Sequence, residues 1–427
     1  MHFHGVLAGN QHPHLLKSRY GKVRYVAESD EQAITITHGY SRDHRPALKQ
    51  AVLALMVSQD GGVPLVSKSW DGNTSDIAVF QERAQALMAA FKNTPSPRYL
   101  IADSKLYHED NAPNLQKLGF ITRIPNTIGA VSQVIAQALT WDTWHRLDAT
   151  TRYQCMALCH YGMAQRWLVV HSQAALERAE ATVTKARQRE AEAIEKQLFH
   201  LHATRFPTPE VAQDALATLA KRWTYQQGES SPLITPKRSA GKGRPTPSTP
   251  LKAIEWQIQA RVRPDQEALG YRQHVKACFV LGTHIGVSQL SDAAVIAAYK
   301  SQSCVEGGFR LLKDPLFCVS SLFVKKPSRI EGLLMVMTLA LLVYSVAQRR
   351  MRQQLARRNE TVPNQIHQPT ASPTLRWVFQ LLEGIHRVRV TVQGQVHDLI
   401  EGLNDVQINI LRLFGEQVCC LYQISPG

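Results

Sequence analysis

The chain has 427 residues, of which 44% are hydrophobic, and this is ample for one large or two ordinary domains. Lysine and arginine outnumber aspartate and glutamate by 49 to 34, and the formal net charge of +15 favours a polyanionic partner. Seven cysteines, an odd number scattered along the chain, exclude a disulfide framework and indicate a reducing compartment.

Targeting and membrane signals are weak. The first ten residues lack the basic start and apolar core of a signal peptide. The longest apolar run, Leu333 to Ala347, is shorter than the ~20 residues needed to span a bilayer. We therefore expect a buried core helix that continues into a basic, exposed one, and no membrane association.

The first third of the chain predicts a sheet with one helix. Strand-like runs occupy residues 33–40, 51–58 and 63–70, and the turn Asp60-Gly61-Gly62 between the last two predicts a hairpin. A helix is expected from Thr74 to Phe91, capped by the polar cluster before it.

Next comes a buried strand that ends in a carboxylate. Residues 98–104 (RYLIADS) place Asp103 at the end of an apolar run, and a short helix and a strand at 119–125 follow. Strands and helices in this order predict an α/β class.

The middle of the chain no longer alternates between short strands and helices. Two strand-like runs flank Tyr161-Gly162 and predict a second hairpin. Helices are expected at 172–202 and, with Thr208 as its cap, up to about Thr224, together forming a helical hairpin. Residues 226–250 are rich in Pro, Ser and Gly, which predicts a flexible basic linker.

Order is predicted to resume after the linker. We expect a helix near 251–262, a strand at 277–284, a helix that contains Glu306, and the apolar helix 329–347. The tail predicts, in order, a helix at 374–386, a strand pair near 387–398 and a helix at 402–415.

Asp103 and Glu306 form the chemically most informative pair. An Asp at a strand end and a Glu on a later helix can converge on two divalent ions, which activate an attacking oxygen and stabilise the leaving oxygen in phosphoryl transfer. Five polar residues spaced by three and four predict one face of a single helix, within an arc of about 80°. They are Tyr299, Gln302, Glu306, Arg310 and Lys313. A solvated face of an amphipathic helix is the alternative.

The same residues resemble the signature of a known family. Bacterial insertion-sequence transposases of the DDE superfamily, in the insertion-sequence-four group, carry Tyr, two residues, Arg, three residues, Glu, six residues and Lys. Further similar stretches run along nearly the whole chain: residues 37–50, 70–76, 101–107, 161–170, 279–284 and 373–385.

The resemblance implies an RNase H-like catalytic core interrupted by a mixed hairpin and helical insertion, with a basic helical C-terminal region. The expected domains are 1–129 and 271–350 for the two parts of the core, 130–270 for the insertion and 351–427 for the C-terminal region. It also implies cleavage at insertion-element ends and strand transfer, two Mg²⁺ or Mn²⁺ ions, a homodimer on paired DNA ends and a bacterial cytoplasmic, nucleoid-associated location.

Carried over by position, Asp103 and Glu306 match catalytic, metal-binding carboxylates. Tyr299, Gln302, Arg310 and Lys313 lie where DNA contacts are expected, although Gln302 replaces the signature Arg and has lost its charge and its bidentate fork. Gly307 also stands where the family commonly has a basic residue.

The family's first Asp has no clear counterpart. The start of the chain aligns just after it, so we expect a truncated copy or a misplaced start, with Asp43 and Asp76 as weak substitutes. Arg166 and Trp167 of the second hairpin could hold a flipped base. The alternative for Trp167 is a core residue, and residues 237–245 resemble a minor-groove hook or a solvated linker.

Rival functions stay open. A non-catalytic DNA-binding remnant or regulator would bind duplex without metal dependence. A structure-selective nuclease on the same fold would cut without needing specific ends. A helical interaction protein built on residues 172–224 would leave Asp103 and the Glu306 helix unexplained.

Overall fold

The computed structural model describes most of the chain as a mixed α/β protein. It divides into two compact units, one formed by Met1–Thr122 with Thr283–Gly427 and the other by Arg123–Gly282. The predicted interruption at 130–270 lies close to the second of these. The described residues are 2–3, 33–39, 47–90, 99–230, 237–239, 244, 247–248, 251–312 and 326–426.

The first unit is built on a mixed sheet. Its strands lie in the order β5-β4-β1-β6-β7. β1 pairs antiparallel with β4, which pairs antiparallel with β5, whereas β1–β6 and β6–β7 are parallel. Their bounds are β1 His2–Phe3, β4 Val52–Val57, β5 Pro64–Trp70, β6 Leu100–Ala102 and β7 Phe120–Arg123.

The β4–β5 hairpin is confirmed. Gly61 and Gly62 in its turn have φ of +81° and +64°, a backbone region that glycine enters without a steric penalty. A second, short pair of strands consists of β2 Thr37–His38 and β3 Lys49–Gln50. β2 lies within the strand predicted at 33–40, and β3 lies just before the strand predicted at 51–58. Only a short part of residues 33–40 is therefore a strand among those described.

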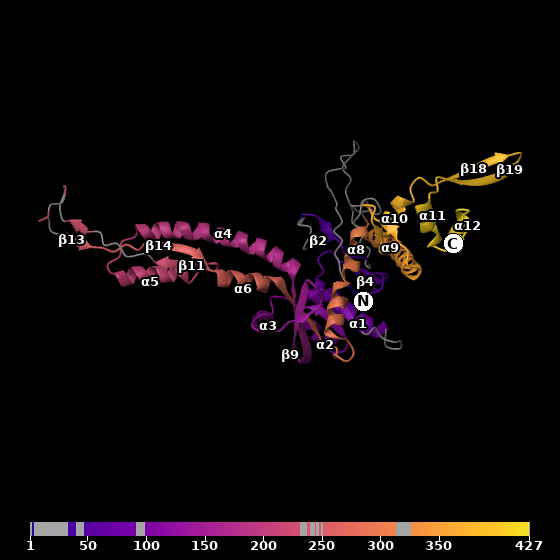
Figure 1. Cartoon of the computed structure of the whole chain (residues 1–427). Helices are drawn as coiled ribbons and strands as arrows, with labels where there is room; N and C mark the ends of the chain where they lie inside the picture. The colour runs from indigo at the N-terminus through magenta and orange to yellow at the C-terminus, as the bar shows by residue number, and fades with distance from the viewer. Residues whose placement is uncertain are drawn as a thin grey trace, which may run out of the picture. The chain divides into compact units, whose positions relative to one another are not determined.

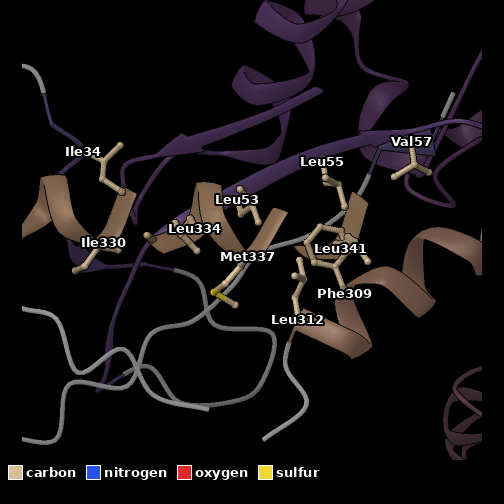
Figure 2. Packing of buried hydrophobic residues seen from close by; sticks show 11 residues of the cluster. Ile34, Leu53, Leu55, Val57, Phe309, Leu312, Ile330, Leu334, Met337 and Leu341 are labelled. Atoms are coloured by element: carbon tan, nitrogen blue, oxygen red, sulfur yellow. The ribbon is translucent and has the colours of Figure 1, made fainter. Parts of the chain in front are cut away.

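One face of β4 packs against two helices, α8 Ser303–Leu312 and α9 Pro327–Arg358 (Figure 2). Alternate residues of a strand point to the same side, and Leu53, Leu55 and Val57 accordingly share one apolar cluster. We call it the β4 cluster. Its buried members are Ile34, Ala51, Leu53, Leu55, Val57, Phe309, Leu312, Ile330, Leu334, Met337 and Leu341.

The predicted helix at 74–91 is confirmed as α1 Asp76–Ala90. Ser75 precedes it, and its hydroxyl accepts a hydrogen bond from the Ala78 amide at 3.2 Å. The α1 helix also contacts two single-turn helices that follow β6, η1 Ser104–Leu106 and η2 Glu109–Asn111. A short helix, α2 Ala112–Leu115, leads from them to β7, as predicted.

The predicted tail of the first unit is also confirmed. The 32-residue α9 ends at Arg358, and its cap Asn359 has a φ of +53°, a left-handed conformation that terminates the helix. A second apolar cluster joins the end of α9 to α10 and α11. The elements after α9 are β16 Val362–Pro363, β17 Pro369–Thr370, α10 Leu375–Leu381, β18 His386–Val392, β19 Gln395–Glu401, α11 Asp405–Arg412 and α12 Glu416–Leu421 (Figure 1).

Within the described residues, α9 is the helix that is long and apolar enough to cross a membrane, and 33% of its apolar window is buried. The core helix of a soluble protein meets the same test of length and composition. The burial of Leu334 and Leu341 in the β4 cluster fits such a core helix.

The second unit contains the predicted hairpin. Strands β9 Thr151–His160 and β10 Met163–Ser172 pair antiparallel along their whole length. Tyr161 and Gly162 form the turn, with φ of +51° and +69°. In the order β15-β10-β9-β8, they lie beside β15 Cys278–Thr283 and β8 His145–Arg146.

The helical hairpin is confirmed as α4 Gln173–Ala203 and α5 Pro209–Ala220, with the Thr208 hydroxyl capping α5. In Figure 1, α4 runs alongside α6 Gln266–Ala277, with which it is in contact. The remaining helix of this unit is α3 Gly129–Leu139.

Two described parts of the expected linker at 226–250 are strands, and most of residues 231–250 lie outside the described residues. They are β11 Gln226–Ser230, paired with β14 Ala260–Pro264, and β12 Lys237–Ser239, paired with β13 Leu251–Ile254. The helix expected at 251–262 is replaced by β13 and β14. Buried Ile258 and Ala260 alternate with more accessible residues at 257, 259 and 261, which is the period of a strand.

Candidate active site

Asp103 stands directly after β6, where the chain leaves the sheet. Its Oδ1 accepts a hydrogen bond from the Ser104 amide at 2.6 Å and so caps the single turn η1. Its backbone carbonyl accepts from the Leu106 amide and from the buried Thr122 hydroxyl, both at 3.0 Å. The half-buried Asp103 is therefore fixed from both its side chain and its backbone.

The parallel strand β1 is the neighbour of β6. Phe3 lies opposite Ala102 in the register, so the carboxyl ends of both strands reach the same edge of the sheet. In sheets with parallel strands, ligand sites form at this edge. Asp103 follows β6 at that edge.

Glu306 does not lie on the single helix predicted for residues 299–313. Tyr299 lies in the last turn of α7 Asp292–Lys300, and Gln302 lies in a turn before α8. The Ser301 hydroxyl donates to the Ala298 carbonyl at 2.6 Å, and the Gln302 amide donates to the Tyr299 carbonyl at 3.1 Å. These bonds close the end of α7, so the predicted arc of about 80° from Tyr299 to Lys313 is wrong.

The exposed side of α8 nevertheless carries charge. Glu306 and Arg310 are exposed and one turn apart, whereas Phe309 and Leu312 are buried in the β4 cluster. Glu306 lies in the first turn of α8, where the helix dipole favours a carboxylate. The helix presents its carboxylate to solvent and anchors itself by the opposite face.

Asp103 and Glu306 belong to the same unit. The α7 helix contacts β6, the strand that Asp103 follows, and two residues after α7 begins α8, which carries Glu306. Among the residues that the structure describes, no group of three His, Cys, Asp or Glu side chains could hold a metal ion. Two carboxylates have the right chemistry for Mg²⁺ or Mn²⁺, but in number they fall short of a two-ion site.

The predicted DNA contacts have varied surroundings. Arg310 is exposed and Tyr299 is half-buried, while Lys313 lies outside the described residues. The side-chain nitrogen of Gln302 is buried and has no hydrogen-bond partner among the described residues. In this arrangement Gln302 does not offer the solvent-facing donor expected of the signature Arg.

Trp167 of the second hairpin is fully buried. Its Nε1 donates a hydrogen bond to Gln165 Oε1 at 3.0 Å, and its ring lies 5.4 Å from that of His160. This supports the core alternative, because stacking on a base requires an accessible ring face. Its neighbour Arg166 is half-buried.

The other candidates lie elsewhere. Asp43 is outside the described residues, and Asp76 is the first residue of α1. Within the motif at 70–76, Asp71 Oδ1 accepts from the Thr35 amide at 2.6 Å, so this motif residue ties two loops together. Part of the hook-like stretch 237–245 forms β12, and the rest is described only at Arg244.

The contact of Thr122 with Asp103 was not predicted from the sequence. A hydroxyl residue within the apolar run of β7 was the available signal, since a buried hydroxyl needs a partner. The sequence around Thr122 could not show that this partner would be the backbone carbonyl of Asp103.

Neither a protein-family model nor a curated protein matches the chain. The family resemblance therefore depends on the motifs quoted above.

Proposed function

We propose that this chain is a DNA transposase of the DDE type, which cleaves insertion-element ends and transfers the strand into target DNA. The proposal includes an RNase H-like core at 1–129 and 271–350, a homodimer on paired ends and a bacterial cytoplasmic location. Asp103 and Glu306 would supply ligands to divalent ions, which stabilise charge on the oxygens of the scissile phosphate.

One observation carries the proposal. A carboxylate stands at the end of β6, beside the parallel strand β1, in the unit that also holds Glu306. The order β5-β4-β1-β6-β7, with an antiparallel meander on one side of β1 and parallel strands on the other, supports an RNase H-like core. The net charge of +15 supports a nucleic-acid partner.

A second candidate is a DNA-binding remnant or regulator that does not cleave. It is favoured by the buried nitrogen of Gln302, where the family signature has Arg, and by the lack of a three-ligand group among the described residues. Such a protein would keep its duplex affinity when divalent ions are removed.

Metal-dependent cleavage separates the candidates. The purified chain is incubated with a plasmid that carries its own gene and flanking DNA, with Mg²⁺, Mn²⁺ or EDTA, and nicked and joined products are sequenced. Asp103→Asn should lower cleavage by at least about 100-fold, because a metal ligand is lost. Asparagine is also a good cap, so η1 and the fold should be retained.

Asp110→Asn is the matched control. Asp110 is an exposed carboxylate close by, in η2, with the His108 ring as its partner at 3.2 Å. Its cleavage rate should stay within about twofold of the parent. Equal cleavage by Asp103→Asn, Glu306→Gln and the parent would exclude the proposed active site, whereas duplex binding without cleavage would support the second candidate.

A further inference from the structure

The second half of α9 carries five arginines, which differ in their exposure and in their hydrogen bonds. Arg349 Nε donates to Asp60 Oδ2 at 2.6 Å. Arg352 donates to the carbonyls of Pro373 at 2.9 Å and Ser372 at 3.3 Å, and burial lowers its pKa. These two arginines fasten α9 to neighbouring loops of the same unit.

Arg350, Arg357 and Arg358 are exposed. Within the part of the chain that the structure describes, no carboxylate or carbonyl pairs with any of the three. Their cationic groups are therefore available to an outside partner.

Arg350 and Arg357 share one face of α9 with two glutamines, Gln353 and Gln354. Positions i, i+3, i+4 and i+7 lie together on a helix, and the buried Met351 and Leu355 hold the opposite side. We call these four residues the arginine strip. At 1.5 Å per residue, its two cations are separated by roughly 10 Å along the axis.

Stabilisation of the helix end explains only part of the strip. Cations in the last turn interact favourably with the carboxyl-end dipole, and this accounts for Arg357 and Arg358. The effect falls off within one turn, so it does not account for Arg350, which lies two turns earlier. The repeated cation on one exposed face is a charge pattern that complements a polyanion.

We propose that the arginine strip binds the phosphate backbone of double-stranded DNA. This inference rests on the proposed function and assigns a DNA-contacting surface outside the candidate active site. Guanidinium groups pair with phosphates in a planar fork, and a spacing of roughly 10 Å suits the phosphates that border a groove about 12 Å wide. The glutamines between them can donate to phosphate or base oxygens.

Charge neutralisation predicts the salt dependence. The full chain is titrated against a short fluorescent DNA duplex, and the dissociation constant is measured by anisotropy at several KCl concentrations. In the double variant Arg350→Gln/Arg357→Gln, two phosphate contacts are lost. The slope of log affinity against log salt should fall by about 1.8, and the affinity at low salt should fall about tenfold or more.

The double variant Arg329→Gln/Lys196→Gln is the control. It removes the same charge from exposed positions, one on the other end of α9 and one on α4, and should leave the slope near that of the parent. All four substitutions are at the surface, so thermal melting should change little.

The outcomes separate the two proposals. If the parent binds duplex and the strip variant matches the control in affinity and slope, the arginine strip is excluded while the proposed function stands. If the parent binds no duplex, both fail. Vesicles containing phosphatidylserine test an anionic surface of another kind. A strip variant that loses vesicle binding and keeps duplex binding would overturn this inference.

Discussion

His171 of β10 shows how strongly one residue can depend on its surroundings. Its Nε2 lies 3.1 Å from Nδ1 of His274 on α6, and the two rings lie 5.3 Å apart. Burial, followed by the nearby charges of Arg152 and His274, lowers the pKa of His171 to about 4. In the neutral pair one ring donates a single N–H···N hydrogen bond to the other, and a proton added to His171 would place a positive charge close to Arg152.

Stability should therefore fall as the pH falls from about 6.5 to 4. In this window the unfolded His171 takes up a proton and the folded one does not, so protons favour the unfolded state. The free energy of unfolding should decrease by at most about 3 kcal/mol through this residue. Urea denaturation at pH 7 and pH 4.5 measures the difference, and His171→Gln should reduce it.

His200→Gln is the matched control, since His200 is exposed on α4. It should retain the pH dependence of the parent. An unchanged pH dependence in His171→Gln would mean that His171 is not kept neutral by its surroundings.

At the scale of an element, α8 carries two adjacent glycines with different environments. A Cβ at Gly307 would meet no atom within 4 Å, whereas a Cβ at Gly308 would lie 3.3 Å from Leu341 Cδ2 of α9. Gly308 thus lies where α8 approaches Leu341 of α9.

Gly307→Ala should stabilise the protein by up to about 1 kcal/mol, because alanine loses less backbone freedom in a helix. Gly308→Ala should stabilise it less, since Leu341 has to shift to make room. Urea denaturation of both variants measures the difference. Equal stabilisation would show that α8 does not lie close to α9 at this point.

The elements with strong local patterns were predictable. The turn at Asp60-Gly61-Gly62, the apolar run of β6 and the cap at Thr208 each produced the expected structure. The break between α7 and α8 was missed because neither Ser301 nor Gln302 excludes a helix by its propensity. The break depends on local hydrogen bonds, such as the one from the Ser301 hydroxyl to the Ala298 carbonyl.

The candidate site could be predicted only in part. The end of an apolar run placed Asp103 after a strand, and helical spacing placed Glu306 and Arg310 on one face of a helix. Burial of the Gln302 nitrogen is a property of the folded packing, which no local pattern encodes.

At the scale of the whole molecule, the β4 cluster joins residues between 34 and 57 to residues between 309 and 341, which the second unit separates in the sequence. Leu341 is 1% exposed in this cluster, so Leu341→Ala should cost about 2–5 kcal/mol. In this variant the rate of amide hydrogen exchange, measured by mass spectrometry, should rise together in β4, α8 and α9, because these elements share one core. The β9–β10 hairpin of the second unit should be unaffected.

Val343→Ala provides the control for this prediction. Val343 is on the same helix but is 70% exposed, so its truncation should change stability by no more than about 0.5 kcal/mol. Comparable losses in both variants would mean that the outward side of α9 is covered in solution.

The interrupted first unit has a consequence for biosynthesis. A ribosome finishes β4 at Val57 long before it adds Leu341, and at 5–20 residues per second the delay is roughly 15 to 60 s. The second unit, continuous from Arg123 to Gly282, emerges during that interval. We expect the nascent chain to expose the apolar face of β4 until α8 and α9 have been synthesised. This makes the nascent chain a substrate for chaperones that act on unfinished polypeptides.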